Sequence, residues 1–200
     1  MLPIKYQDQL FPEAGCDEAG RGCLAGPVVA AAVILPDDFE HELLDDSKKL
    51  SEAHRLILKD YIEKKALAYA VGFVSHQEID DINILQASFL AMHRALDGLK
   101  VRPKHIIVDG NRFNKYKKVA HTCIVKGDSK FASIAAASIL AKTYRDAHMV
   151  QVAKKYPEYG WLTNKGYPTK AHREAIKLHG TTPIHRMTFR LLSLKEKGQR

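Results

Sequence analysis

The sequence predicts an α/β layer fold, in which helices cover a largely buried sheet. Short runs of β-branched and small apolar residues alternate along the chain with longer segments whose apolar residues recur at helical spacing. Of the 200 residues, 46% are hydrophobic, which is enough for the sizeable core of one domain. The chain contains neither an internal repeat nor a low-complexity block, so these observations favour a single layered domain.

The first half of the chain reads as a strand–helix–strand unit followed by a second helix. Residues 28–35 and 66–74 have the pattern of buried strands. Between them, Ser51 can cap a helix whose apolar residues fall at helical spacing. A longer helix follows and ends near Gly98. The apolar positions of the two helices are Ala53, Leu56, Ile57, Tyr61 and Ile62, and then Ile79, Ile82, Leu85, Phe89, Met92 and Leu96.

The second half continues the alternation. The run "HIIVDGN" predicts a strand that delivers Asp109 to its C-terminal end, and "HTCIVKGD" contains a further strand. Residues 129–156 give the strongest helix, and their small side chains would let it lie close against the sheet. After the turn-rich loop "YPEYGWLTNKGYP", Thr169 caps a last helix that ends at Gly180. The polar tail "LKEKGQR" is expected to be a frayed helix end.

Charge and cysteine usage narrow the function classes. Lysine plus arginine exceeds aspartate plus glutamate by 31 − 23 = 8, which makes a polyanion such as nucleic acid the first expected partner. The longest apolar run, residues 23–35, is shorter than the roughly 20 residues of a membrane-spanning helix, and no signal peptide is recognisable. We therefore expect a cytoplasmic protein without membrane association. No C-x-x-C pair occurs among the cysteines, which argues against a disulfide framework or a zinc knuckle: Cys16, Cys23 and Cys123.

Four acids fall at the ends of predicted elements: Asp17 and Glu18 after an early strand, Asp109 after a later one, and Asp128 at a helix start. If they converged, mutual repulsion would raise their pKa values unless cations neutralised them, and an all-oxygen cluster suits Mg²⁺ or Mn²⁺. Two such ions can align water with a phosphodiester and neutralise the leaving oxygen. The alternatives are that Asp128 caps the following helix and that Asp109 is an ordinary turn acid.

The acid pair carries a geometric condition. Neighbouring strand residues point to opposite faces, so Asp17 and Glu18 reach one site only if the strand ends or bends directly after them. The glycines of "AGRG" make that bend credible. Gly20, Arg21 and Gly22 also suit a ligand, because glycines let the backbone approach closely and arginine can fork onto a phosphate, although a generic turn is the alternative. No Rossmann fingerprint, phosphate loop or nucleophile elbow is present.

Further candidates have weaker signals. Lys48 in "DDSKKLS" could bind phosphate, although loop lysines are more often simply solvated. Tyr167 in "NKGYPTKAHR" could stack on a sugar or base, with ordinary packing as the alternative. His172 and His179 share a helical face, but their seven-residue spacing and the lack of further ligands argue against a metal site.

Taken together, these segments resemble the type 2 ribonuclease H family, in particular its bacterial ribonuclease HII branch. The resemblance implies a ribonuclease H-like fold, a five-stranded mixed sheet flanked by helices, with a small C-terminal helical region. We therefore expect one domain over residues 1–200, with an α/β core over about 1–156 and a helical extension over about 157–200. The matching strings, in order from residue 15 to 189, are "GCDEAGRGCLAGPVVAAAVIL", "DDSKKLS", "IIVDGN", "KGDSKFASIAAASILAKTYRD", "YGWLTNKGYPTKAHREAIKLHG" and "TPIHRMTF".

The resemblance also implies an activity and its residues. Such enzymes hydrolyse the RNA strand of RNA–DNA hybrids and incise 5′ to a single ribonucleotide in duplex DNA, leaving 5′-phosphate and 3′-hydroxyl ends. The family's loop that senses the 2′-hydroxyl falls on Gly20, Arg21 and Gly22, and its junction-reading tyrosine falls on Tyr167. Asp146, beside Arg145, is expected in an ion pair or a supporting role. The family's four carboxylates, which hold two divalent ions, Mn²⁺ or Mg²⁺, fall on Asp17, Glu18, Asp109 and Asp128.

Two alternatives to this function stay open. A ribonuclease HIII-like enzyme would need longer RNA tracts; it usually has an extra N-terminal domain, whereas only about fifteen residues precede the first motif here. A catalytically silent hybrid-binding module would use its basic surface alone, but clustered carboxylates weaken phosphate binding unless metals intervene. We expect a monomer that binds RNA–DNA hybrid or ribonucleotide-containing DNA, and the sequence does not reveal whether a replication clamp is a partner.

Overall fold

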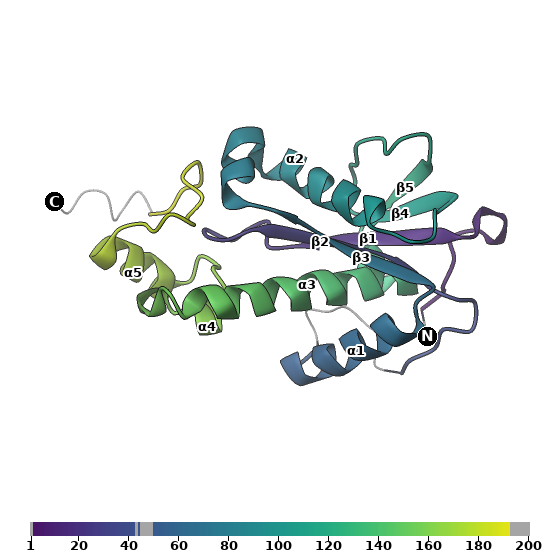
Figure 1. Ribbon diagram of the computed structural model, residues 1–200, viewed down its shortest axis with the longest axis horizontal. Coiled ribbons are helices and arrows are strands. Elements are labelled where there is room, and N and C mark those ends of the chain that lie inside the picture. The colour runs from purple at the N-terminus through teal and green to yellow at the C-terminus, as the bar shows by residue number, and fades with distance from the viewer. Residues whose placement is uncertain (1, 43, 45–49, 193–200) are drawn as a thin grey trace.

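The computed structural model describes residues 2–42, 44 and 50–192 (Figure 1). Its centre is a five-stranded sheet in the order β3-β2-β1-β4-β5. β1 pairs antiparallel with β2, which pairs antiparallel with β3, whereas β1, β4 and β5 run parallel. The predicted five-stranded mixed sheet is confirmed. The strands are β1 (Glu13–Ala19), β2 (Val28–Ile34), β3 (Ala68–Val74), β4 (His105–Asp109) and β5 (Ala120–Ile124).

Helices cover both faces of the sheet. α2 lies on one face, α1 and α3 lie on the other, and α4 and α5 follow beyond the C-terminal end of α3 (Figure 1). The predicted caps are confirmed, because Ser51 accepts a hydrogen bond from His54 N and Thr169 accepts one from His172 N. The turn-rich loop before Thr169 contains a short helix that the sequence did not predict. The helices are α1 (Glu52–Lys65), α2 (His76–Asp97), α3 (Ala132–Ala153), α4 (Trp161–Asn164) and α5 (Lys170–His179).

Alternation along β2 explains why both faces are apolar. Ala30 and Ala32 pack in the core beneath α2, whereas Ala31 and Val33 pack in the core beneath α3. The approach of α3 is unusually close, as its small side chains predict. A Cβ atom on Gly15 of β1 would lie 2.5 Å from Ile134 N and 2.6 Å from Ser133 O of that helix. Only glycine therefore lets α3 lie directly on the central strand.

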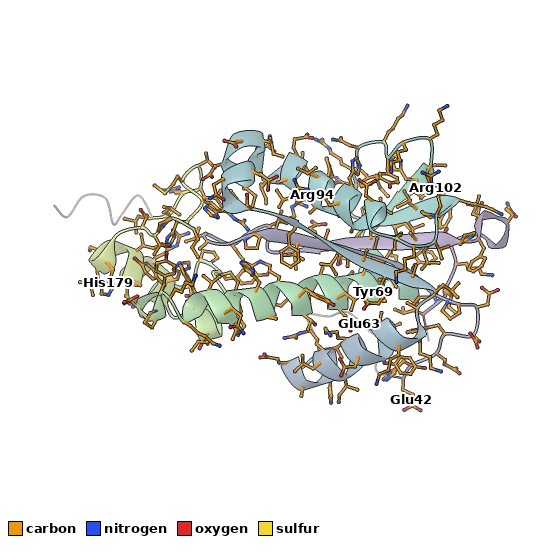
Figure 2. All side chains as sticks on the ribbon, viewed as in Figure 1. Glu42, Glu63, Tyr69, Arg94, Arg102 and His179 are labelled. Atoms are coloured by element: carbon orange, nitrogen blue, oxygen red, sulfur yellow. The ribbon has the colours of Figure 1, made fainter. Side chains whose placement is uncertain are left out.

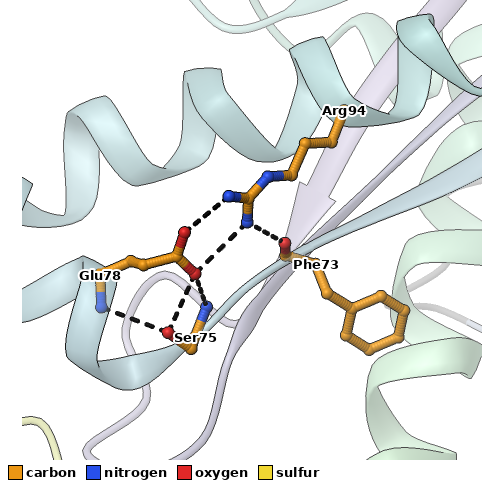
Figure 3. Close-up of polar contacts among 4 residues, drawn as sticks. All are labelled: Phe73, Ser75, Glu78 and Arg94. Carbon is orange, nitrogen blue, oxygen red and sulfur yellow. Dashed lines mark hydrogen bonds and ion pairs between the residues drawn. The ribbon is translucent and has the colours of Figure 1, made fainter.

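The junction between β3 and α2 is fixed by a polar network (Figure 3). Ser75 Oγ accepts from Glu78 N at 3.2 Å, and Glu78 Oε2 accepts from Ser75 N at 2.9 Å, which forms a capping box. Arg94, 16 residues after Glu78 in α2, donates to Glu78 Oε1 and to the carbonyl of Phe73, both at 2.6 Å. These bonds hold the pKa of Glu78 down at about 2, with Arg94 as the main cause.

A hydrogen bond joins the two helices on the other face of the sheet. Tyr144 of α3 donates to Glu63 of α1 at 2.8 Å, and Figure 2 shows Glu63 directed from α1 toward α3.

α2 is interrupted at Asn83, whose φ of 66° is not helical and whose Oδ1 accepts from Leu85 N and Gln86 N. No helix among the described residues is long and apolar enough to span a membrane.

Candidate functional site

Three of the four predicted acids lie around one pocket at the carboxyl ends of the parallel strands β1 and β4. The pocket has a volume of about 250 Å³. Its lining includes Asp17, Glu18 and Asp109, together with the loop from Gly20 to Gly22 and Tyr167. Sequence segments that lie up to 150 positions apart therefore meet at one edge of the sheet, because adjacent parallel strands present the same end there.

The strand β1 ends and the chain turns directly after Asp17 and Glu18, as both side chains require to reach one site. Asp17 lies on the face of the sheet that α3 covers, and Glu18 follows it one residue before the strand ends at Ala19. Gly20 then adopts a φ of +95°, a left-handed conformation that side chains disfavour, and the chain turns. Both carboxylates line the pocket as a result, and Asp17 Oδ1 accepts a hydrogen bond from Glu18 N at 2.7 Å.

Two of the acids at this pocket have raised pKa values, with burial as the main cause. Burial raises the pKa of Asp17 well above its ordinary value, and the neighbouring Glu18 and Asp109 raise it further, opposed by a hydrogen bond from Ser138. Burial also raises the pKa of Glu18, although Arg21 opposes the shift from 3.1 Å. Carboxylates held together in this way favour a cation or a proton.

The donor set suits a hard divalent cation, because it consists of carboxylate oxygens without sulfur or imidazole. Within residues 2–42, 44 and 50–192, however, no three His, Cys, Asp or Glu side chains are gathered so that they could hold a metal ion. Glu18 is turned to Arg21, and Asp109 Oδ1 accepts a hydrogen bond from Gly127 N at 2.7 Å.

Asp109 and Asp128 have different surroundings. Asp109 is the last residue of β4, as the sequence predicts, and lines the pocket. Asp128 lies in a short 3₁₀ turn and is buried, but it is not among the residues that line the pocket. Its alternative role as a helix cap is wrong, because α3 begins only at Ala132 and the residue at its cap, Phe131, makes no side-chain capping bond. Of the four acids, Asp17, Glu18 and Asp109 therefore line the pocket, whereas Asp128 lies buried in the turn before α3.

Two buried arginines hold the backbone around the Gly20–Gly22 loop. Arg186 donates to the carbonyl of Arg21 at 2.9 Å and to that of Gly26 at 3.0 Å. Arg145 donates to three further carbonyls, those of Ala25, Pro27 and Lys165. Burial lowers the pKa of Arg186 to about 10, so its side chain stays charged at neutral pH. The loop is therefore positioned by charged donors rather than by its own turn alone.

Tyr167 lines the same pocket and is half-buried. Its ring centre is 5.3 Å from Lys142 Nζ and 5.6 Å from the guanidinium carbon of Arg145. Lys142 also pairs with Asp146 at 2.8 Å, so the expected ion pair of Asp146 forms with Lys142 and not with Arg145. Sequence reasoning missed Ser138 and Lys142, which both line the pocket. Their four-residue spacing on a predicted helix was an available signal.

The remaining candidates do not join the pocket. Lys48 lies outside the described residues. His172 and His179 do not form a site together, because His172 is buried whereas His179 is exposed on the last turn of α5 (Figure 2). All three cysteines are thiols without a disulfide, as predicted.

Comparisons with known proteins agree with this architecture. The family model described as Ribonuclease HII matches residues 14–192. A relative from Bacteroides thetaiotaomicron named Ribonuclease HII is 66% identical over 192 residues, covering 96% of this chain and 95% of that protein. The ribonuclease HII of Archaeoglobus fulgidus, solved in complex with PCNA, has a TM-score of 0.75 at 27% identity and is covered over 100% of its length by 93% of this chain. Bst-RNase HIII in complex with Mn²⁺, at 19% identity, shares the fold with a TM-score of 0.72, over 94% of this chain and 70% of its own.

Proposed function

The chain belongs to the ribonuclease HII family, and from this premise we propose that its candidate site incises duplex DNA 5′ to a single embedded ribonucleotide. A ribonuclease H is an endonuclease that acts on RNA paired with DNA. The proposal adds that one ribonucleotide is enough for recognition and that the cut leaves a 3′-hydroxyl and a 5′-phosphate. The observation that carries it is the pocket in which three carboxylates, the Gly20–Gly22 loop and Tyr167 meet.

The acids are proposed to hold divalent cations. Asp17, Glu18 and Asp109 would provide the oxygen ligands, with Asp128 from the neighbouring turn, and the ions would be two Mg²⁺ or Mn²⁺. When bound, such ions neutralise charge on the scissile phosphate and activate water for attack. The raised pKa values of Asp17 and Glu18 support this role, because carboxylates that are buried beside further acids are stabilised in their charged form by a cation. The Mn²⁺ complex of Bst-RNase HIII, which shares the fold, is consistent with it.

The neighbouring groups are proposed to read the sugars. The 2′-hydroxyl both donates and accepts hydrogen bonds, so backbone groups of Gly20, Arg21 and Gly22 can recognise it whatever the base. Tyr167, which lines the same pocket, would pack against the deoxyribose that follows on the 3′ side. The carbonyl of Arg21 is fixed by Arg186, which supports a preformed detector rather than a flexible turn.

The variant Asp109→Asn tests the site. Asparagine keeps an oxygen for Gly127 N but loses the negative charge, so metal-dependent nicking of a duplex with one ribonucleotide should be abolished while the fold is kept. Asp60→Asn, an exposed acid on α1, is the matched control and should be fully active. The products are mapped on a sequencing gel and folding is checked by circular dichroism. Full activity in Asp109→Asn would refute the assignment of the carboxylates.

Two substrates separate the proposed function from its alternatives. A ribonuclease HIII-like enzyme would cut a duplex with four consecutive ribonucleotides and leave one with a single ribonucleotide intact. A hybrid-binding module would give no product at all and would bind equally well with and without EDTA. The proposed function requires a metal-dependent cut of the single-ribonucleotide duplex on the 5′ side.

We also propose that the chain acts in the cytoplasm as a monomer and as one domain. The bond from Arg186, in the C-terminal region, to Arg21, beside the acids, supports a single unit over residues 1–200, in which the core of about 1–156 and the extension of about 157–200 share one site. Light scattering at the concentration of the activity assay tests the monomer, and one cooperative unfolding transition is expected for one domain.

A further inference from the structure

Two buried histidines, His172 and His185, lie next to the backbone of Tyr167 and have no role in the proposed reaction. His172, at the start of α5, is fully buried, and His185 is 1% exposed. His172 Nδ1 lies 2.9 Å from the carbonyl oxygen of Tyr167. His172 Nε2 lies 3.0 Å from Trp161 Nε1 and 3.2 Å from His185 Nε2. The pair thus connects the hydrophobic core of the C-terminal region with the backbone of the pocket.

The partners determine which nitrogen carries each proton. Indole N–H and backbone N–H groups can only donate. Thr182 N donates to His185 Nδ1 at 2.9 Å, so the proton of His185 is on Nε2 and points at His172. His172 Nε2 faces the N–H groups of Trp161 and His185, which share its single lone pair, so the proton of His172 is on Nδ1 and is donated to Tyr167 O. These hydrogen bonds therefore form a series in which each group donates to the next, from Thr182 N through His185 and His172 to the carbonyl of Tyr167.

Protonation of either histidine would disrupt this series of hydrogen bonds. An additional proton on either ring would face a donor, at His172 Nε2 or at His185 Nδ1. The pKa values agree, because burial lowers that of His172, and burial together with His172 lowers that of His185 to about 4. Both rings are neutral at neutral pH, and their orientations are fixed.

The bond to Tyr167 O acts on a short, tightly held segment. Tyr167 N donates to Asn164 O at 2.8 Å, and Tyr167 O also accepts from Thr169 N at 2.8 Å. The preceding Gly166 O accepts from Leu24 N, also at 2.8 Å, which joins the segment to the chain that follows the Gly20–Gly22 loop. Of these contacts, only the bond from His172 comes from a side chain, and it sets the carbonyl orientation from within the core.

We propose that His172 is a positioning residue, which places Tyr167 against the sugar on the 3′ side of the ribonucleotide through its Nδ1–H bond to the Tyr167 carbonyl. The proposal rests on the proposed role of Tyr167 in reading that sugar. Rings and loops that are misplaced by about 1 Å can cost a hundredfold in rate, so one fixed carbonyl can affect recognition. His185 and Trp161 both contact Nε2, so either donor alone keeps the proton of His172 on Nδ1, where it faces Tyr167 O.

Two substitutions separate positioning from mere core packing. Asparagine places an amide near the position of Nδ1, so His172→Asn keeps a donor for Tyr167 O but leaves the N–H groups of Trp161 and His185 without an acceptor. Glutamine extends to the position of Nε2, so His172→Gln keeps that acceptor but loses the donor to Tyr167. Buried unpaired donors are costly, whereas Tyr167 O retains Thr169 N. His172→Asn should therefore be the less stable variant and His172→Gln the less selective one.

The measurement is the ratio of kcat/KM on a single-ribonucleotide duplex to kcat/KM on a uniform RNA–DNA hybrid, in which no deoxyribose follows the cut. We expect His172→Gln to lower this ratio about tenfold, as loss of one directing hydrogen bond would. His172→Asn should leave the ratio unchanged despite its lower melting temperature. Trp161→Phe, which removes one donor to Nε2 and keeps Nδ1 free to donate, is a second variant with lower stability and an unchanged ratio.

The outcomes distinguish this proposal from the one on which it rests. If His172→Gln keeps the wild-type ratio, or if the ratio falls equally in His172→Asn and Trp161→Phe so that it follows stability, His172 has no positioning role. Tyr167→Ala is measured in parallel. If that variant keeps the wild-type ratio, the sugar-reading role of Tyr167 itself is wrong, whatever the histidine variants do.

Discussion

The close packing of α3 on β1 makes Gly15 the most informative single position for stability. In Gly15→Ala the new methyl carbon would clash with the carbonyl carbon of Ser133 and lie 2.5 Å from Ile134 N, where ordinary contact begins at 3.4 Å, so the helix must retreat by about 1 Å. Overpacking of this kind costs about 3 kcal/mol, at the upper end of the usual range, because the clash is with backbone and no rotamer change relieves it. For a chain of this size the melting temperature should fall by about 6–12 °C.

Urea unfolding followed by circular dichroism measures this cost. Gly22→Ala is the matched control, since nothing lies within 4 Å of its new Cβ atom, and its free energy of unfolding should stay within about 0.5 kcal/mol of wild type. Because Ser138 and Lys142 of α3 line the pocket, Gly15→Ala should also lower nuclease activity in the remaining folded protein. If Gly15→Ala were as stable as Gly22→Ala, the account of why α3 lies so close to the sheet would be wrong.

Two further predictions concern pH and helix capping. Folding lowers the pKa of His185 from 6.5 to about 4. Between these two pH values the unfolded chain binds a proton that the folded chain does not. The free energy of unfolding should therefore fall by up to about 3 kcal/mol as the pH drops through this window. Urea titrations at pH 7 and pH 4.5 should show this loss in wild type and not in His185→Gln; parallel losses would contradict it. Ser75→Ala should cost about 1 kcal/mol by removing one bond of the capping box, whereas Thr181→Ala, at an exposed position, should cost almost nothing. Equal stabilities of these two variants would show that the box does not stabilise α2.

Much of the fold could be predicted from the sequence, because its signals are local. The predicted strand over 28–35 and the caps at Ser51 and Thr169 agree with the structure to within a residue. The interruption of α2 at Asn83 was missed, since the apolar stripe continues through it on both sides. An asparagine whose side chain caps the next turn was the available signal.

The site was less predictable, because its decisive contacts are distant in sequence. The acids of β1 and β4 could be found as acids at strand ends. That Asp128 lies in a separate turn away from the pocket lining depends on where α3 begins, and helix boundaries are the least certain feature of a sequence pattern. His172 and Arg186 could not be assigned a role, because their partners lie on backbone carbonyls, which no sequence pattern marks.

The bond between Arg186 and Arg21 has a consequence for how this nuclease is made. During translation the acids of β1 leave the ribosome early, whereas Arg186 is added 165 residues after the carbonyl that it holds. A partly synthesised chain can thus carry the acids of β1 without the fixed loop beside them. On the proposed function, the ability to tell a ribose from a deoxyribose is acquired last, when the C-terminal region folds back onto the loop after β1.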